Sequence, residues 1–386
     1  MVAETGDAKA RVARGGWHSQ MPDDDSPGPA TQASASAGRS PEISRQMQRE
    51  MAGYRPLVLR EMDAPTLADV LAARRRIRPH LDPSPLRNYP SIDRLVGAEV
   101  WVKHENLLPT GAFKVRGGVN LMSQLDAQTR ARGVISASTG NHGQSIAFAA
   151  RLFGVSAIIC APGNANPVKV EAMRDLGAEV VLVGKDFDDA REHCERLARE
   201  HGYRYIHSGN EPDLIAGVGT HTLEVLEERP DIEVVIVPVG GGSGASGACI
   251  AGKSIRPELE VIGVQSAQAP TAHDSWREGK LVERPMQTVA EGLATRTAFE
   301  LPQRIIRERL DDFVLVSDDE LLAAVAVMIE KTRTLVEPAG AAALAAALSP
   351  QTRGRIKGRK VALICSGANI SPAQLREVAG AGALIR

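Results

Sequence analysis

The sequence predicts an α/β protein made of two doubly wound domains with mainly parallel sheets. From about residue 66 onward, short apolar runs alternate with amphipathic stretches of helical length, the pattern of strand–helix–strand units with right-handed crossovers. Only 3% of the residues are aromatic while alanine and glycine are plentiful, and small side chains suit close packing of helices on sheets. A chain of 386 residues is also longer than one ordinary compact core.

The first regular element that we expect is a helix capped by Thr66, because the apolar positions that follow recur at helical spacing. Residues 81–87 (LDPSPLR) carry two prolines, which predicts a break. The apolar run over 98–103 predicts a strand, and a helix is expected to begin near Lys114.

Downstream of Lys114, strands and helices are expected to alternate. Apolar runs predict strands over residues 133–137, 156–160, 179–183, 203–206, 234–239, 260–264, 312–316 and 360–365. Amphipathic or small-residue stretches predict helices over 143–153, 167–176, 188–201 and 245–251.

The composition excludes several classes of protein. Residues 1–48 contain few large apolar side chains, so we predict a disordered N-terminal extension without a secretory signal. A net charge of −1 gives no reason to expect a nucleic-acid partner, and no apolar run is long enough for a membrane span. The four scattered cysteines form no CxxC pair, so we interpret them as buried thiols of a cytoplasmic protein without a metal site.

Lys114 is the centre of KHENLLPTGAFKVRGG (103–118), which joins a predicted strand to a predicted helix. The unpaired backbone N–H groups of a helix start disfavour a charged amine and attract an anionic ligand. Since a neutral lysine is a nucleophile toward an aldehyde, this position suggests Schiff-base chemistry. Taken alone, however, Lys114 fits a solvated surface lysine better.

Four stretches together resemble one enzyme family. They are TGAFKVRGG (110–118), STGNHGQS (138–145), PVGGGSG (238–244) and CSGAN (365–369). In order and content they are similar to the motifs of the threonine and serine dehydratases and serine racemase, which are pyridoxal-phosphate enzymes of fold type II, the tryptophan-synthase-β fold. The resemblance implies pyridoxal 5′-phosphate as the cofactor and a small amino acid as the substrate.

The resemblance also implies a domain organisation. A small domain over residues 133–210 would be inserted into a large cofactor-binding domain formed by residues 49–132 and 211–386. Members of the family commonly form homodimers or homotetramers, so one of these assemblies is expected here.

The resemblance implies that Lys114 bonds the cofactor, with Phe113 beside the ring. The loop that follows the apolar strand over 234–239 would hold the cofactor phosphate, because its backbone N–H groups converge on an anion at a helix start. This loop consists of Gly240, Gly241, Gly242, Ser243 and Gly244. Without the resemblance, a glycine cluster is more often a tight turn.

A second turn would hold the substrate carboxylate, and it consists of Ser138, Thr139, Gly140, Asn141 and His142. Asn141 would also hydrogen-bond the phenolic oxygen of the cofactor. Ordinary helix capping explains Ser138, Thr139 and Asn141 as well. His142 has no obvious acidic partner, so a structural role beside the carboxylate is its other interpretation.

Ser366 would face the pyridine nitrogen of the cofactor. A hydroxyl partner leaves that nitrogen largely unprotonated, which favours prompt loss of a β-leaving group. Gly292 and Glu337 lie in stretches that match family loops around the cofactor, so both are further candidates, although a turn and a helix start explain them equally well.

Two departures from the serine racemases refine the prediction. Those enzymes carry a catalytic serine where this chain has Thr139, which keeps a hydroxyl but adds a methyl group; Thr139 is therefore a catalytic candidate, with racemisation less favoured. The positions of the acidic cation ligands of the racemases are occupied here by Gln265, Ala269 and Thr271. Neutral side chains bind a hard cation poorly, so no cation site is expected here.

The predicted activity is dehydration and deamination of a 2-amino-3-hydroxy acid such as L-threonine or L-serine to a 2-oxo acid and ammonia. The alternatives within the family are an unusual substrate (hydroxyaspartate, phenylserine or a hydroxyectoine-derived acid) and serine racemisation. A non-catalytic cofactor-binding relative is the alternative outside enzymes.

Overall fold

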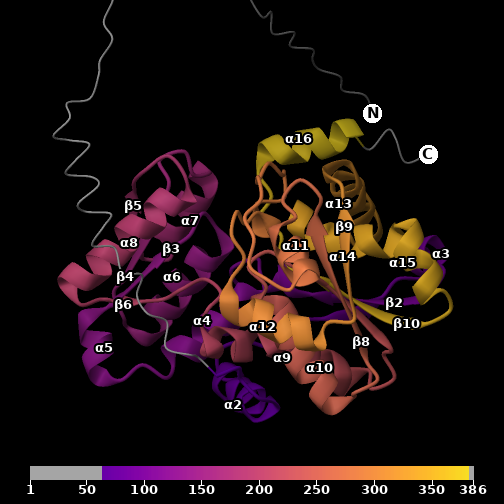
Figure 1. Ribbon diagram of the computed structural model, residues 1–386, viewed down its shortest axis with the longest axis horizontal. Coiled ribbons are helices and arrows are strands. Elements are labelled where there is room, and N and C mark those ends of the chain that lie inside the picture. The colour runs from indigo at the N-terminus through magenta and orange to yellow at the C-terminus, as the bar shows by residue number, and fades with distance from the viewer. Residues whose placement is uncertain (1–62, 382–386) are drawn as a thin grey trace, which may run out of the picture. The chain divides into compact units, whose positions relative to one another are not determined.

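The structure is a computed structural model, and it describes residues 63–381. The predicted disordered extension over residues 1–48 lies outside this range. The expected α/β class with mainly parallel sheets is confirmed, because helices and strands alternate along the described chain and the strands form two sheets (Figure 1).

The larger sheet in residues 63–381 has six strands in the order β1-β2-β10-β7-β8-β9. Their bounds are Leu86–Asn88 (β1), Glu99–His104 (β2), Lys360–Cys365 (β10), Val234–Pro238 (β7), Glu260–Ser266 (β8) and Asp312–Val316 (β9). All neighbours are parallel except β1, which pairs antiparallel with β2. The break predicted over residues 81–87 is therefore wrong at its end, because β1 begins at Leu86, directly after the second proline, as a short edge strand.

The smaller sheet is parallel throughout, in the order β5-β4-β3-β6. Its strands are Glu179–Leu182 (β5), Ala157–Ala161 (β4), Val134–Ala137 (β3) and Arg204–Tyr205 (β6). All of them lie within residues 133–210, the segment predicted as an insertion. The chain leaves the larger sheet after β2 and returns to it at β7, while the domain boundaries themselves stay a prediction.

Alternating side chains of the central strand β7 decide where the helices pack. Val234 and Ile236 contact a core formed with α13 (Asp318–Thr332) and α14 (Pro338–Leu348). Val235 and Val237 point to the opposite face, toward α9 (Pro212–Glu228), α10 (Ser243–Ile255) and α12 (Glu300–Arg309), which lie together in Figure 1. Burial of both faces explains why this strand has no polar residue.

The smaller sheet is covered on two sides as well, by α6 (Asn141–Phe153) and α7 (Pro167–Asp175) on one and by α8 (Phe187–His201) on the other. The remaining helices are α2 (Leu67–Ile77), α3 (Pro90–Val96), α4 (Lys114–Met122), α5 (Ala127–Arg132), α11 (Thr271–Glu278), α15 (Pro350–Ile356), α16 (Pro372–Ala381) and the short 3₁₀ turns η1 (Glu105–Leu107) and η2 (Glu291–Leu293). As predicted, Thr66 caps α2, in a capping box with Asp69.

A buried ion cluster holds α4, the helix that begins at Lys114. The guanidinium of Arg116 contacts Glu105 Oε2 at 2.6 Å and Glu224 Oε1 at 2.6 Å, and all three belong to different elements. Lys103 Nζ lies 2.6 Å from Glu224 Oε2, so two cations meet two carboxylates. The cluster therefore ties α4 to η1, β2 and α9.

The four cysteines are free and buried, as predicted. Between residues 63 and 381, no helix combines the length and apolar content of a membrane span.

Candidate active site

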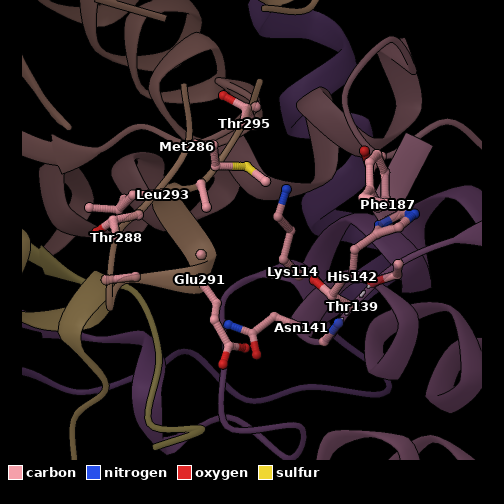
Figure 2. Close-up of a pocket in the computed structure, with 18 of the residues that line it drawn as sticks. Lys114, Thr139, Asn141, His142, Phe187, Met286, Thr288, Glu291, Leu293 and Thr295 are labelled. Atoms are coloured by element: carbon pink, nitrogen blue, oxygen red, sulfur yellow. Dashed lines mark hydrogen bonds between the residues drawn. The ribbon is translucent and has the colours of Figure 1, made fainter. Parts of the chain in front are cut away.

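A cavity of about 510 Å³ is lined by elements of both sheets. Every residue that the sequence assigned to the site lines it: Phe113, Lys114, Ser138, Thr139, Gly140, Asn141, His142, Gly240, Gly241, Gly242, Ser243, Gly244, Gly292 and Ser366, together with Glu337. Figure 2 shows the amine of Lys114 between Met286 on one side and Thr139, His142 and Phe187 on the other.

Lys114 is the first residue of α4, as expected. Its Nζ donates a hydrogen bond to Ser243 Oγ at 2.9 Å and lies 5.2 Å from the centre of the Phe113 ring. Burial, which disfavours the charged amine, lowers the pKa of Lys114 to about 8. The amine is therefore poised as a nucleophile near neutral pH.

The first three residues of the glycine loop pack too closely against their surroundings for a side chain. A Cβ atom on Gly240 would lie 2.2 Å from the carbonyl oxygen of Gly292, and one on Gly241 would lie 2.4 Å from the Phe299 ring. Gly242 has φ +92°, a left-handed conformation that favours glycine. Because α10 begins at Ser243, its unpaired N–H groups and dipole favour an anion at this end of the cavity.

The turn between β3 and α6 is held by its own side chains. Ser138 Oγ accepts hydrogen bonds from the backbone N–H groups of Gly140 (3.1 Å) and Gly143 (2.8 Å). Ser138 therefore caps an N–H group in the first turn of α6, which is the alternative role considered for it above. Ser136 Oγ donates to the carbonyl oxygen of Ile206, so it accepts from Nε2–H of His142 at 2.8 Å. Burial, with a smaller effect of Lys114, lowers the pKa of His142 to about 3, and its ring is a neutral anchor of the turn.

Ser366 follows β10 directly and is buried at the cavity wall. Its Oγ donates a hydrogen bond to the carbonyl oxygen of Ala339 at 3.2 Å. The hydroxyl can meet an unprotonated ring nitrogen, which only accepts, if its hydrogen turns from Ala339 to that nitrogen; the carboxylate of Glu337 lies on the same wall.

Five charged residues at the cavity were not predicted from the sequence: Asp186, which caps α8, and the members of two ion pairs. Lys169 Nζ pairs with Glu291 Oε2 at 2.6 Å, and Arg296 pairs with Asp188 Oδ2 at 2.6 Å. Each pair joins the segment around η2 to a helix beside the smaller sheet. Lys169 and Asp188 give no local signal, because charges on amphipathic helices normally face solvent, whereas Glu291 and Arg296 lie in the stretch around Gly292 that resembles a family loop.

Comparisons with known proteins agree with this geometry. Residues 77–367 match the family described as pyridoxal-phosphate dependent enzymes. L-threonine ammonia-lyase from Thermotoga maritima is 39% identical over 79% of this chain and 76% of its own length. L-threo-3-hydroxyaspartate ammonia-lyase from Saccharomyces cerevisiae is 36% identical over 80% of this chain and 94% of its own length. The solved structure of maize serine racemase aligns with a TM-score of 0.78 and 32% identity, over 82% of this chain and 98% of that one.

The chain belongs to the family of pyridoxal-phosphate-dependent enzymes, and pyridoxal phosphate is its cofactor. The residues present fit that group. The glycine loop, in which Gly240, Gly241 and Gly242 have no room for a Cβ, suits a phosphate, and the amine of Lys114 suits an aldehyde.

Proposed function

We propose that this protein is an ammonia-lyase that converts L-threonine or L-serine to a 2-oxo acid and ammonia. The observation that carries the proposal is the position of the partly buried amine of Lys114, between the glycine loop and the turn over residues 138–142. The resemblance of the whole chain to an L-threonine ammonia-lyase supports the same reaction.

When bound, the cofactor supplies an aldehyde that combines with amines and a ring that withdraws electrons from the α-carbon of the substrate. In the proposed mechanism, Lys114 holds the cofactor at rest, with Phe113 beside the ring. Backbone N–H groups of the glycine loop would bind the phosphate, with Gly292 behind them, and Ser366 would turn its hydroxyl hydrogen from Ala339 to the ring nitrogen.

The turn over residues 138–142 binds the substrate carboxylate through its N–H groups and hydroxyls, with His142 anchoring the turn. The neutral amine of Lys114 then takes the α-proton as general base. In the net reaction the α-proton and the β-hydroxyl leave together as water, and hydrolysis of the remaining enamine releases ammonia and the 2-oxo acid. Thr139 lines the cavity, and its hydroxyl is proposed as a second proton-transfer group.

The test compares the wild-type protein with Lys114→Ala. We expect the wild type to be yellow and to release keto acid and ammonia from L-threonine or L-serine, and the variant to lose both the visible band and turnover. Lys331→Ala is the matched control, because Lys331 pairs with Glu330 and does not line the cavity. Turnover by Lys114→Ala would refute the assignment.

The same assay separates the rival substrates and reactions. 3-Hydroxyaspartate represents the activity of the yeast relative, and D-serine formation from L-serine represents racemisation. A yellow protein that is silent with threonine and serine would leave an unusual hydroxy amino acid or a non-catalytic role.

We propose further that the protein is a cytoplasmic homodimer or homotetramer. The family resemblance supports the assembly, and the four free thiols suit a reducing compartment. Light scattering of the purified protein measures the assembly, and a monomer would contradict it.

A further inference from the structure

The motif that ends in Asn369 contains a residue to which the function above assigns no role. Asn369 Nδ2 donates a hydrogen bond to the carbonyl oxygen of Thr110 at 2.9 Å and another to Asn141 Oδ1 at 2.8 Å. Asn141 Nδ2 in turn donates to Glu337 Oε1 at 2.6 Å. Two side-chain amides and one carboxylate thus form a chain that ends at the cavity wall.

The direction of every bond in this chain follows from its first member. A backbone carbonyl only accepts, so the nitrogen of the Asn369 amide must face Thr110. The same nitrogen meets Asn141, which must therefore present its oxygen to Asn369 and its nitrogen to Glu337. A flipped Asn141 amide would place nitrogen against nitrogen at one end and oxygen against a carboxylate at the other.

Backbone packing fixes the carboxylate end of the chain. A Cβ atom on Gly367 would lie 2.2 Å from Glu337 Oε1 and 3.3 Å from Asn141 Nδ2. The backbone next to Ser366 therefore packs closely against these two side chains. Lys169 Nζ lies 3.8 Å from Glu337 Oε2 and supplies a compensating charge. Burial raises the pKa of Glu337, while Lys169 and the Asn141 bond oppose that rise.

We infer that Asn369 and Glu337 are positioning residues that hold Asn141 as a hydrogen-bond donor toward the phenolic oxygen of the cofactor. One N–H of Asn141 is taken by Glu337, and the second has no partner within residues 63–381. A donor at that place favours the ionised phenolic oxygen, which belongs to the yellow form of the bound cofactor. This inference rests on the cofactor site proposed above.

The test is the absorbance spectrum of the cofactor-loaded Asn369→Asp variant. A carboxylate keeps the shape of the side chain but accepts only, so it repels Asn141 Oδ1 and favours the flipped amide. Hydrogen bonds to charged groups contribute enough that we expect the ratio of the yellow to the near-ultraviolet form to fall about tenfold. A folded, loaded Asn369→Asp protein with the wild-type ratio would overturn the inference.

Asn106→Asp is the matched control, because Asn106 is buried and its Nδ2, like that of the partly buried Asn369, donates to a backbone carbonyl (Leu335, 2.9 Å) and to a side chain (Thr334, 3.1 Å). We expect this control to lose stability yet keep the wild-type ratio. A fall as large as that of Asn369→Asp would show a general packing effect and overturn the inference.

Two further variants keep the test decisive if Asn369→Asp does not fold. Glu337→Gln retains an acceptor oxygen and should keep the wild-type ratio of the yellow to the near-ultraviolet form. Glu337→Ala has no acceptor oxygen, so this ratio should fall several-fold. Equal ratios in these two proteins would overturn the inference. A wild-type protein that does not turn yellow with pyridoxal phosphate would instead refute the proposed site itself.

Discussion

At the residue scale, burial alone determines the unusual acidity of Lys114. No charged neighbour contributes to the shift, so the pKa falls to about 8 because the ammonium form loses its hydration. The amine of the cofactor-free protein is therefore mostly neutral above that pH and mostly charged below it. Free lysine side chains become neutral only near their usual pKa of about 10.4.

We predict that cofactor-free protein captures pyridoxal phosphate at a rate that rises about tenfold per pH unit up to pH 8 and then levels off, because only the neutral amine attacks the aldehyde. Stopped-flow absorbance at the yellow band measures this rate, with a lysine-containing peptide as the reference. A rate that keeps rising beyond pH 9 would contradict the lowered pKa.

The local sequence was sufficient to predict those site residues whose place in the fold depends on their immediate neighbours. Lys114 and the glycine loop each follow a predicted strand and open a predicted helix, and both contexts are present in the structure. The partners of Asn141 were beyond prediction, because Asn369 and Glu337 lie about two hundred residues away in the sequence. Only the folded chain brings these side chains together.

At the scale of elements, apolar runs identified the strands correctly because each central strand is buried on both faces and needs apolar residues throughout. A strand at the exposed edge of a sheet needs fewer apolar residues, so its sequence pattern is weaker. The three-residue strand β1 was missed because it has one buried, one exposed and one half-buried residue and follows Pro85. Its pairing with β2 is a long-range contact that no local pattern marks.

The junction between β7 and α10 yields a prediction about cofactor affinity. In Gly240→Ala the new Cβ would lie 2.2 Å from a backbone oxygen, so the loop must move. Overpacking of this kind costs ~1–3 kcal/mol, and we expect the cofactor Kd to rise about tenfold or more in an absorbance titration.

The matched control is Gly354→Ala in α15, where a Cβ would have no neighbour within 4 Å. Alanine favours a helix, so this variant should be slightly more stable and should bind the cofactor as the wild type does. Equal Kd values for the two alanine variants would mean that the glycine loop does not shape the phosphate site.

At the scale of the whole molecule, buried charged residues are the feature that is hardest to predict from the sequence. Arg116, Lys103 and Glu105 are completely buried, although such residues are rarely buried unless they are paired. Glu224, which pairs with two of them, lies on α9, more than a hundred residues further along the chain. Burial by itself would raise the pKa of Glu105, but the Arg116 guanidinium holds that pKa far below its usual range.

This cluster gives a prediction about global stability. Arg116→Met leaves two carboxylates with only Lys103 as a cation, so we expect a loss of ~3–5 kcal/mol in the free energy of unfolding, measured by urea denaturation. Arg196→Met is the control, because Arg196 is exposed, and its contacts with Glu200 (3.9 Å) and His193 (2.6 Å) lie at the surface; its effect should stay within about 1 kcal/mol.

The double variant Arg116→Met, Glu105→Met decides whether charge balance is the cause. It leaves Lys103 and Glu224 as one balanced pair at 2.6 Å and replaces the other pair by apolar side chains. Since well-packed apolar residues often replace buried ion pairs without loss, the double variant should recover most of the stability that Arg116→Met loses. The loss of stability in the double variant could instead equal the sum of the losses in Arg116→Met and in Glu105→Met alone. The cluster would then stabilise the molecule through packing, and α4 would be held at the active site by shape rather than by charge.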